Sequence, residues 1–142
     1  NMVNLVVDTN VFVSALISEV GASREVIRRC LLGRYHPCVS LALFTEYRAL
    51  LGRHELYTNC ALDAGERDAL FRALMAVSRM TDIYFLWRPN LPDEADNHVL
   101  ELAVAARAVA IATYNLADFV RSELRFPELR ILAPAQLLKE YP

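Results

Sequence analysis

The chain has 142 residues, 55% of them hydrophobic, and its 15 basic and 17 acidic residues give a net charge of −2. This length suits a single domain over residues 1–142, and the apolar content excludes a disordered chain. The charge excludes a generally basic surface, so any nucleic-acid binding must come from local placement of basic side chains. Arg24, Arg28 and Arg29 share one expected helix and could hold phosphates, although a solvated helix face is the simpler explanation.

The apolar segments and the cysteines bound the class of protein further. No apolar run approaches the ~20 residues that a membrane span requires, and no signal peptide precedes the first apolar run. We therefore expect a soluble, cytoplasmic protein with no membrane partner. The three cysteines lack C-x-x-C spacing and the three histidines lack H-x-x-x-H spacing, which argues against disulfides, zinc or a His-based metal site.

Short apolar runs alternate with segments of helical periodicity along the chain. The expected strands are Leu5–Val7, His36–Val39, Ile83–Leu86, Val109–Ala112 and Ile131–Leu132. The first expected helices are Val11–Ile17, a second that carries Val26 to Leu32 and is ended by Gly33, and a third from the cap Ser40 to Gly52. A fourth runs from the capping box Asp63/Glu66 to about Met80, and a fifth is capped by Asp93. A short helix is expected around Asp118–Leu124 and a last one around Ala135–Lys139.

Strands that alternate with helices of ten or more residues imply right-handed crossovers and a parallel sheet covered on both faces. The pattern therefore predicts an α/β fold. We expect a three-layer α/β/α sandwich with a central parallel sheet of four to five strands.

Carboxylates follow or flank the strand ends of this expected sheet. In an open α/β sheet, residues just past the carboxyl ends of the strands lie together along one edge, which is where ligands bind. Three or four carboxylates meeting there would repel one another unless protons or a divalent cation neutralised them. Oxygen ligands without His or Cys match a hard ion, Mg²⁺ or Mn²⁺, which suits phosphodiester hydrolysis. The acids expected at this edge are Asp8, Glu46, Asp93, Asp96 and Asp118.

Each of these acids also has an explanation without function. Asp8 could cap the helix that begins near Val11, and Asp118 could cap its own short helix. Asp93 and Asp96 could complement the dipole of the helix that they open. Glu46 could form a surface ion pair with an arginine such as Arg53.

The order of these motifs resembles the PIN-domain family, in the branch of toxin components of bacterial toxin-antitoxin modules. The resemblance covers nearly the whole chain. It rests on Val-Val-Asp8-Thr9-Asn10-Val-Phe, on Glu46 within a helix, on Pro92-Asp93-Glu94-Ala95-Asp96-Asn97, and on Ala-Thr113-Tyr114-Asn115-Leu-Ala-Asp118-Phe119.

The resemblance implies a metal-dependent ribonuclease whose acidic pocket binds Mg²⁺ or Mn²⁺. It also implies RNA as substrate, a cognate antitoxin that blocks the site, and a homodimer. This chain departs from the family pattern at Asn115, where many members carry Asp. The residues implied as catalytic and as metal ligands are Asp8, Glu46, Asp96 and Asp118. The residues implied in supporting roles are Thr9, Asn10, Thr113 and Asn115.

Two other functions fit parts of the pattern. Asn115 adds no charge to the pocket, so the chain could be a catalytically degenerate PIN scaffold that binds RNA or protein. Asp8 could instead be a nucleophile that forms an aspartyl phosphate, as in haloacid-dehalogenase-like phosphatases. Those enzymes place a second Asp two residues later, where this chain has Asn10.

Overall fold

The computed structural model describes residues 2–83 and 97–142, and within these residues the strands form one parallel sheet. The sheet order is β3-β2-β1-β4-β5, so the apolar run Leu5-Val6-Val7 belongs to the central strand. Leu5 and Val6 are fully buried, as a strand covered on both faces requires. The strands are β1 (Asn4–Val7), β2 (His36–Val39), β3 (Arg79–Met80), β4 (Ala110–Ala112) and β5 (Arg130–Leu132).

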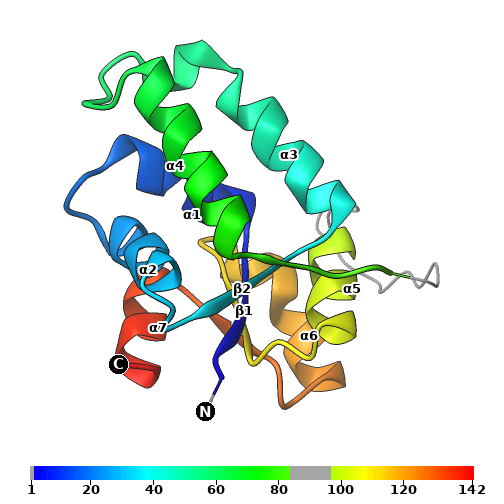
Figure 1. Cartoon of the computed structure of the whole chain (residues 1–142). Coiled ribbons are helices and arrows are strands. Elements are labelled where there is room, and N and C mark those ends of the chain that lie inside the picture. The colour runs from blue at the N-terminus through cyan, green and yellow to red at the C-terminus, as the bar shows by residue number, and fades with distance from the viewer. Residues whose placement is uncertain (1, 84–96) are drawn as a thin grey trace.

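Helices cover both faces of this sheet. Figure 1 shows α2 and α7 on one side of the strands and α5 and α6 on the other, which confirms the three-layer α/β/α sandwich. None of the helices in the described part of the chain is both long and apolar enough to cross a membrane. The helices are α1 (Thr9–Ile17), α2 (Ala22–Leu31), α3 (Leu41–Leu51), α4 (Ala64–Val77), α5 (Asn97–Ala105), α6 (Val120–Arg125) and α7 (Pro134–Glu140), with 3₁₀ turns η1 (His54–Tyr57) and η3 (Leu116–Phe119).

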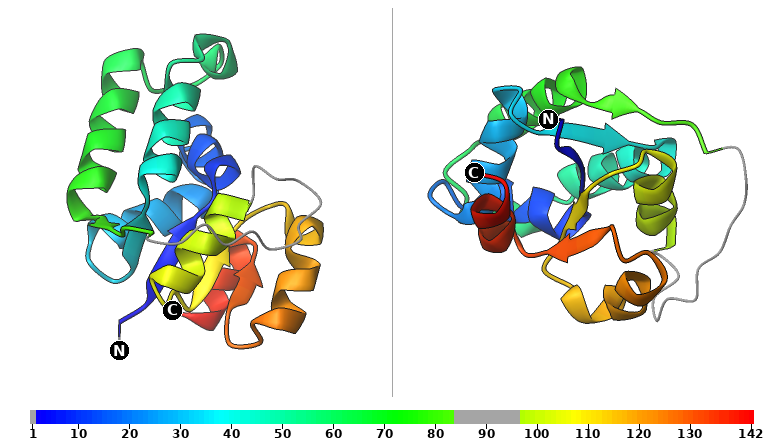
Figure 2. Two further views of the ribbon diagram at one scale, coloured as in Figure 1. Left: turned by 90° about the vertical axis from the view of Figure 1, so that its right-hand side faces the viewer. Right: turned by 90° about the horizontal axis from the view of Figure 1, so that it is seen from below.

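The helices α3 and α4 form an antiparallel pair that extends beyond the sheet (Figure 2). The rings of Phe44 and Phe71 meet across the pair with centroids 5.5 Å apart. Asp63 and Glu66 form the expected capping box at the start of α4. The buried hydroxyl of Tyr47 donates a hydrogen bond to the carbonyl of Val7, which fastens α3 to the end of β1.

The third strand lies earlier than the sequence predicts. The fourth helix ends at Val77 and not near Met80, because Ser78 adopts extended backbone angles. Arg79–Met80 then pairs with β2, and the amide of Thr81 donates to the carbonyl of Val39. The expected strand Ile83–Leu86 is therefore wrong at Ile83, which is not in a strand, and residues 84–86 lie outside the described residues. The expected cap Asp93 lies outside them as well.

The pairing register of β1 and β4 determines which residues meet at the carboxyl edge. Val7 is opposite Ala112, and the amide of Asp8 donates to the carbonyl of Ala112 at 2.9 Å. The first residue after each strand, Asp8 and Thr113, therefore emerges at the same level of the sheet.

Two glycines that end helices should respond oppositely to alanine. Gly33 has φ of 81°, where a Cβ is strained, so Gly33→Ala should lower the free energy of unfolding by about 1 kcal/mol. Gly52 has φ of −78°, and an added Cβ would meet its nearest atoms at 3.7 Å. Gly52→Ala should therefore be neutral or stabilise by about 0.5 kcal/mol. Urea unfolding of both variants measures the difference, and equal losses would contradict it.

Candidate functional site

Asp8 lies at the carboxyl end of the central strand with its side chain almost wholly buried, 2% exposed. It is the N-cap of α1, and its Oδ1 accepts a hydrogen bond of 2.8 Å from the amide of Thr9. Its Oδ2 accepts from the hydroxyl of Thr113 at 2.8 Å and from Nδ2 of Asn10 at 3.2 Å. Asp8 is thus a helix cap, but one whose second oxygen is fixed from across the sheet.

The polar residues around Asp8 form one connected network. Asn10 also donates to Thr113 Oγ1 at 3.3 Å, while its own Oδ1 accepts from the amide of Tyr114 at 3.0 Å. The amide of Asn115 donates to Thr113 Oγ1 at 3.0 Å. Because the side-chain oxygen of Asn10 is already engaged, Asn10 holds the loop after β4 in place and is not a free metal ligand.

Burial raises the pKa of the Asp8 carboxyl above its usual value, and this cause outweighs the lowering by the hydrogen bonds from Thr113 and Thr9. The negative charge of Glu46 raises this pKa further, whereas His98 lowers it. All the hydrogen-bond donors to Asp8 among the described residues are uncharged. A buried carboxylate held in this way gains stability from a bound cation, which is the property that a metal ligand needs.

Glu46 is half-buried on α3, and its negative charge lies near enough to Asp8 to raise the pKa of that carboxyl. One of its carboxylate oxygens is hydrogen-bonded to Nε2 of His98, in the first turn of α5. The alternative ion pair of Glu46 with Arg53 is wrong, because Arg53 pairs with Glu55 at 3.1 Å. The structure therefore brings Glu46 and His98 together at the margin of the site.

A cavity of about 360 Å³ opens beside Asp8, and we call it the Asp8 hollow. Asp8 follows β1 and Asn115 lies in the loop after β4, so the hollow is at the carboxyl edge of the sheet. Its residues are Asp8, Thr9, Asn10, Val13, Leu50, Arg53, Leu56 and Asn115.

Asp118 is not one of the residues that line this hollow in the described part of the chain. Asp118 lies within η3, half-buried, and Asn115 and not Asp118 lines the hollow. Asp118 also does not cap its helix, since Asn115 occupies the N-cap of η3. Asp96 lies outside the described residues and stays a prediction from the sequence. Within residues 2–83 and 97–142, no three His, Cys, Asp or Glu side chains form a group that could hold a metal ion.

Two residues at this site, His98 and Arg53, were not expected from the sequence to belong to it. His98 belongs to no H-x-x-x-H pair, and its contact with Glu46 depends on how α5 packs on α3, which no local pattern reveals. Arg53 follows the Gly52 that ends α3, and its position in the hollow depends on the turn into η1. The signal available for both was a charged residue close in sequence to an expected element end.

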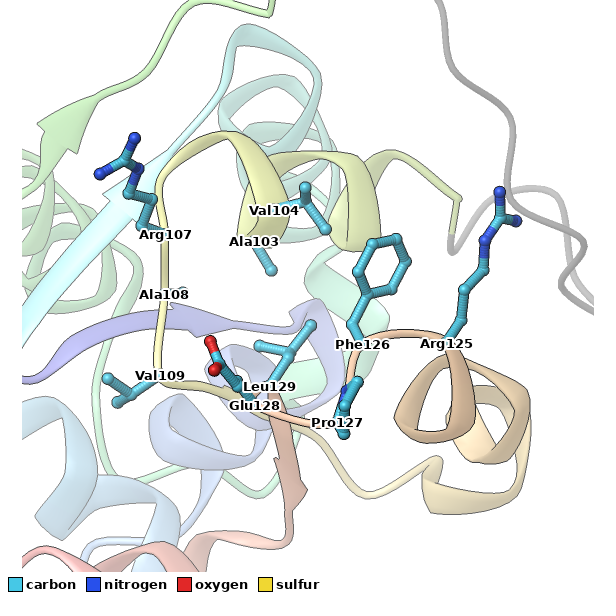
Figure 3. A pocket seen from close by; sticks show the side chains of 10 residues that line it. All are labelled: Ala103, Val104, Arg107, Ala108, Val109, Arg125, Phe126, Pro127, Glu128 and Leu129. Carbon is cyan, nitrogen blue, oxygen red and sulfur yellow. The ribbon is translucent and has the colours of Figure 1, made fainter.

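A larger cavity, of about 740 Å³, lies away from these residues (Figure 3). Its walls include Val109 and Leu129, which precede β4 and β5 and so lie at the amino edge of the sheet. Figure 3 shows the ring of Phe126 between α5 and the segment that leads to β5. Because Asp8 and Thr113 stand at the opposite edge, this cavity does not contribute to the candidate site.

A parallel α/β sheet with a buried acid at the carboxyl end of its central strand defines a class of proteins that bind ligands at that edge. The model of the PIN domain matches residues 4–117, so the chain belongs to the PIN domain family. This confirms the resemblance seen in the sequence. None of the curated protein sequences matches the chain.

One solved structure is similar to most of the chain. It is the crystal structure of VapBC2 from Rickettsia felis bound to a DNA fragment from their promoter. The likeness covers 92% of this chain and 98% of that chain, with a TM-score of 0.56 and 12% sequence identity. At this identity the likeness shows a shared fold.

Removing the hydroxyl of Thr113 should weaken the fold at the site. Thr113→Val keeps the shape of this fully buried side chain but leaves Asp8 without one donor, so the free energy of unfolding should fall by roughly 1–3 kcal/mol. Thr113→Ser should restore most of it. The control is Thr45→Val, because Thr45 is exposed and donates to its own helix; we expect a change within about 0.5 kcal/mol. Similar urea midpoints for Thr113→Val and Thr45→Val would disprove the role of Thr113.

Proposed function

We propose that this protein is a metal-dependent endoribonuclease and the toxin component of a type II toxin-antitoxin module. It hydrolyses RNA phosphodiester bonds at the Asp8 hollow. Membership of the PIN domain family supports nuclease activity, and the fold shared with the VapBC2 structure supports the toxin assignment.

The observation that carries this proposal is the burial of the Asp8 carboxylate and the environment of uncharged donors around it. The carboxylate is buried at the carboxyl edge of the sheet and accepts hydrogen bonds from uncharged donors. Burial raises its pKa above the usual value. Such a group is costly to the fold and has the chemistry of a ligand for a hard cation. Asp8 and Glu46 would hold Mg²⁺ or Mn²⁺, with the amide oxygen of Asn115 as a neutral donor. Asp96 and Asp118 are further ligands that the family pattern implies.

The bound ion would polarise a phosphoryl oxygen and lower the pKa of a bound water. The side chains of this chain do the positioning. Thr113 and Asn10 fix the orientation of the Asp8 carboxylate, and His98 fixes one oxygen of Glu46. This arrangement leaves little reorganisation for the moment of reaction, which is how preorganised sites lower a barrier.

The partners that we propose follow from the toxin assignment. A cognate antitoxin would cover the Asp8 hollow, with an arginine as one means of reaching the carboxylates. We also propose that the protein acts in the cytoplasm and as a homodimer.

Asn115 favours a second candidate, a PIN scaffold that binds RNA or protein without cutting it. It lines the hollow where many family members have an acid. With one negative charge fewer, the site would hold a divalent ion less tightly. An aspartyl-phosphate mechanism finds less support, because Asn10 is engaged with Tyr114 and Thr113 and offers no acid beside Asp8.

Replacing Asp8 tests its assignment to the nuclease site. Asp8→Asn keeps the shape of the side chain but removes its charge, so Mn²⁺-dependent cleavage of a labelled RNA should fall about a hundredfold or more. The control is Asp68→Asn, because Asp68 is half-exposed on α4 and pairs with Arg72. Cleavage by folded Asp8→Asn protein at the native rate would refute the assignment of Asp8.

Calorimetric titration with Mn²⁺ tests the metal without reference to activity. The native chain should bind Mn²⁺, and Asp8→Asn should lose at least the roughly ten- to hundredfold in affinity that loss of a group supporting a metal ligand produces. If the native chain takes up no Mn²⁺ at millimolar concentration, the scaffold becomes the better assignment.

The toxin assignment has its own test in the neighbouring gene. We expect the gene immediately upstream to encode a small DNA-binding protein that forms a complex with this chain and inhibits its nuclease activity. Gel filtration of the two co-expressed proteins would show the complex. A neighbour that does not bind this chain would count against the toxin assignment while leaving the nuclease assignment intact.

A further inference from the structure

We propose that Arg53 binds a phosphate of single-stranded RNA at the Asp8 hollow and positions the strand there. This inference rests on the proposed function, because it names a residue that holds the substrate of that same site. Arg53 would position the RNA strand, because it lines the hollow without contacting Asp8.

Arg53 is the cation of the hollow. Among the residues that line it, Asp8 carries the negative charge and Arg53 the positive one. Arg53 stands where α3 has ended and η1 begins, as the N-cap of η1. The two charged groups therefore come from different parts of the chain, one from the end of β1 and the other from the turn after α3.

The guanidinium of Arg53 is available to an incoming anion. Its recorded partner is Oε1 of Glu55 at 3.1 Å, and the two side chains are 59% and 65% exposed. An ion pair this exposed contributes little to stability, so a phosphate can replace the carboxylate at small cost. The planar fork of an arginine matches the oxygens of a phosphate and can bind two of them at once.

The rest of the hollow and the overall charge explain why this one arginine matters. The net charge of −2 supplies no general attraction for RNA, and the charge of Asp8 repels a phosphate. Attraction must come from a local cation. Val13, Leu50 and Leu56 provide an apolar wall beside it, which suits the ribose or base of an unpaired nucleotide.

Binding of a fluorescein-labelled RNA of ten nucleotides, measured by anisotropy in EDTA, tests the proposal without metal or cleavage. Arg53→Ala should weaken binding about tenfold and reduce the slope of log K against log salt by about 0.7, the value for one lost phosphate contact. Arg53→Lys should keep the slope but bind more weakly than native protein, because it retains the charge and loses the fork. The control is Arg72→Ala, which removes an exposed arginine that also has an ion pair.

Glu55→Gln tests whether Arg53 is shared between its two partners. Releasing the guanidinium from Glu55 should tighten RNA binding about twofold or more. Asp68→Asn is the matched control, because it removes the same charge from the exposed ion pair with Arg72. Equal effects of Glu55→Gln and Asp68→Asn would show an effect of net charge alone and would overturn the exchange of partners.

The outcomes separate this inference from the proposed function. If native protein cleaves RNA while Arg53→Ala has the salt slope and KM of Arg72→Ala, the role of Arg53 is overturned and the nuclease stands. If native protein binds RNA through Arg53 but does not cleave it, the role of Arg53 stands and the scaffold replaces the nuclease. If native protein neither binds nor cleaves RNA, both are overturned. In an active enzyme, Arg53→Ala should raise KM and leave kcat nearly unchanged.

Discussion

The hydrogen bond from Thr113 to Asp8 is the contact on which the rest of the site depends. It forms because Val7 and Ala112 are paired in the sheet, so the residues after them emerge side by side. The Thr113 hydroxyl donates a hydrogen bond to Asp8 and accepts hydrogen bonds from Asn10 and Asn115, which connects the ends of β1 and β4 in one network. A shift of one residue in this register would turn the side chains of one strand to the other face and separate Asp8 from Thr113. The sheet therefore fixes the site before any ligand is present.

This arrangement sets stability against function at Asp8. Burial raises its pKa, and the neutral donors around it only partly offset the cost of a charge out of water. Glu46 adds a second negative charge nearby that raises the pKa of Asp8 further, whereas His98, which is hydrogen-bonded to Glu46, lowers it. Residues that destabilise a fold in this way are typical of sites selected for binding or catalysis.

The sequence predicts the features that depend on local pattern and fails where packing decides. Buried strands such as β1 are recognisable in the sequence as apolar runs. Because Asp8 and Thr113 directly follow such runs, the sequence alone assigns them to the carboxyl edge of the sheet. The strand Arg79–Met80 escapes prediction because it is two residues long, exposed and without an apolar pattern. Gly33 and Gly52 give the same helix-stop signal, yet one has a positive φ and the other does not. The Glu46 contact with His98 and the place of Arg53 in the hollow depend on tertiary packing, which no local spacing encodes.

The two charges in the Asp8 hollow raise the question of why they do not neutralise each other. An arginine beside a buried carboxylate would normally form an ion pair and lower its pKa. Here Arg53 pairs with Glu55, two residues further along the same turn, and the pKa of Asp8 stays raised. Glu55 remains ionised, because its own backbone hydrogen bond and then Arg53 lower its pKa. The turn into η1 thus supplies a local partner that keeps the arginine away from the acid. A hollow built in this way retains one group for a cation and another for an anion, and a metal-dependent site for a phosphodiester needs both.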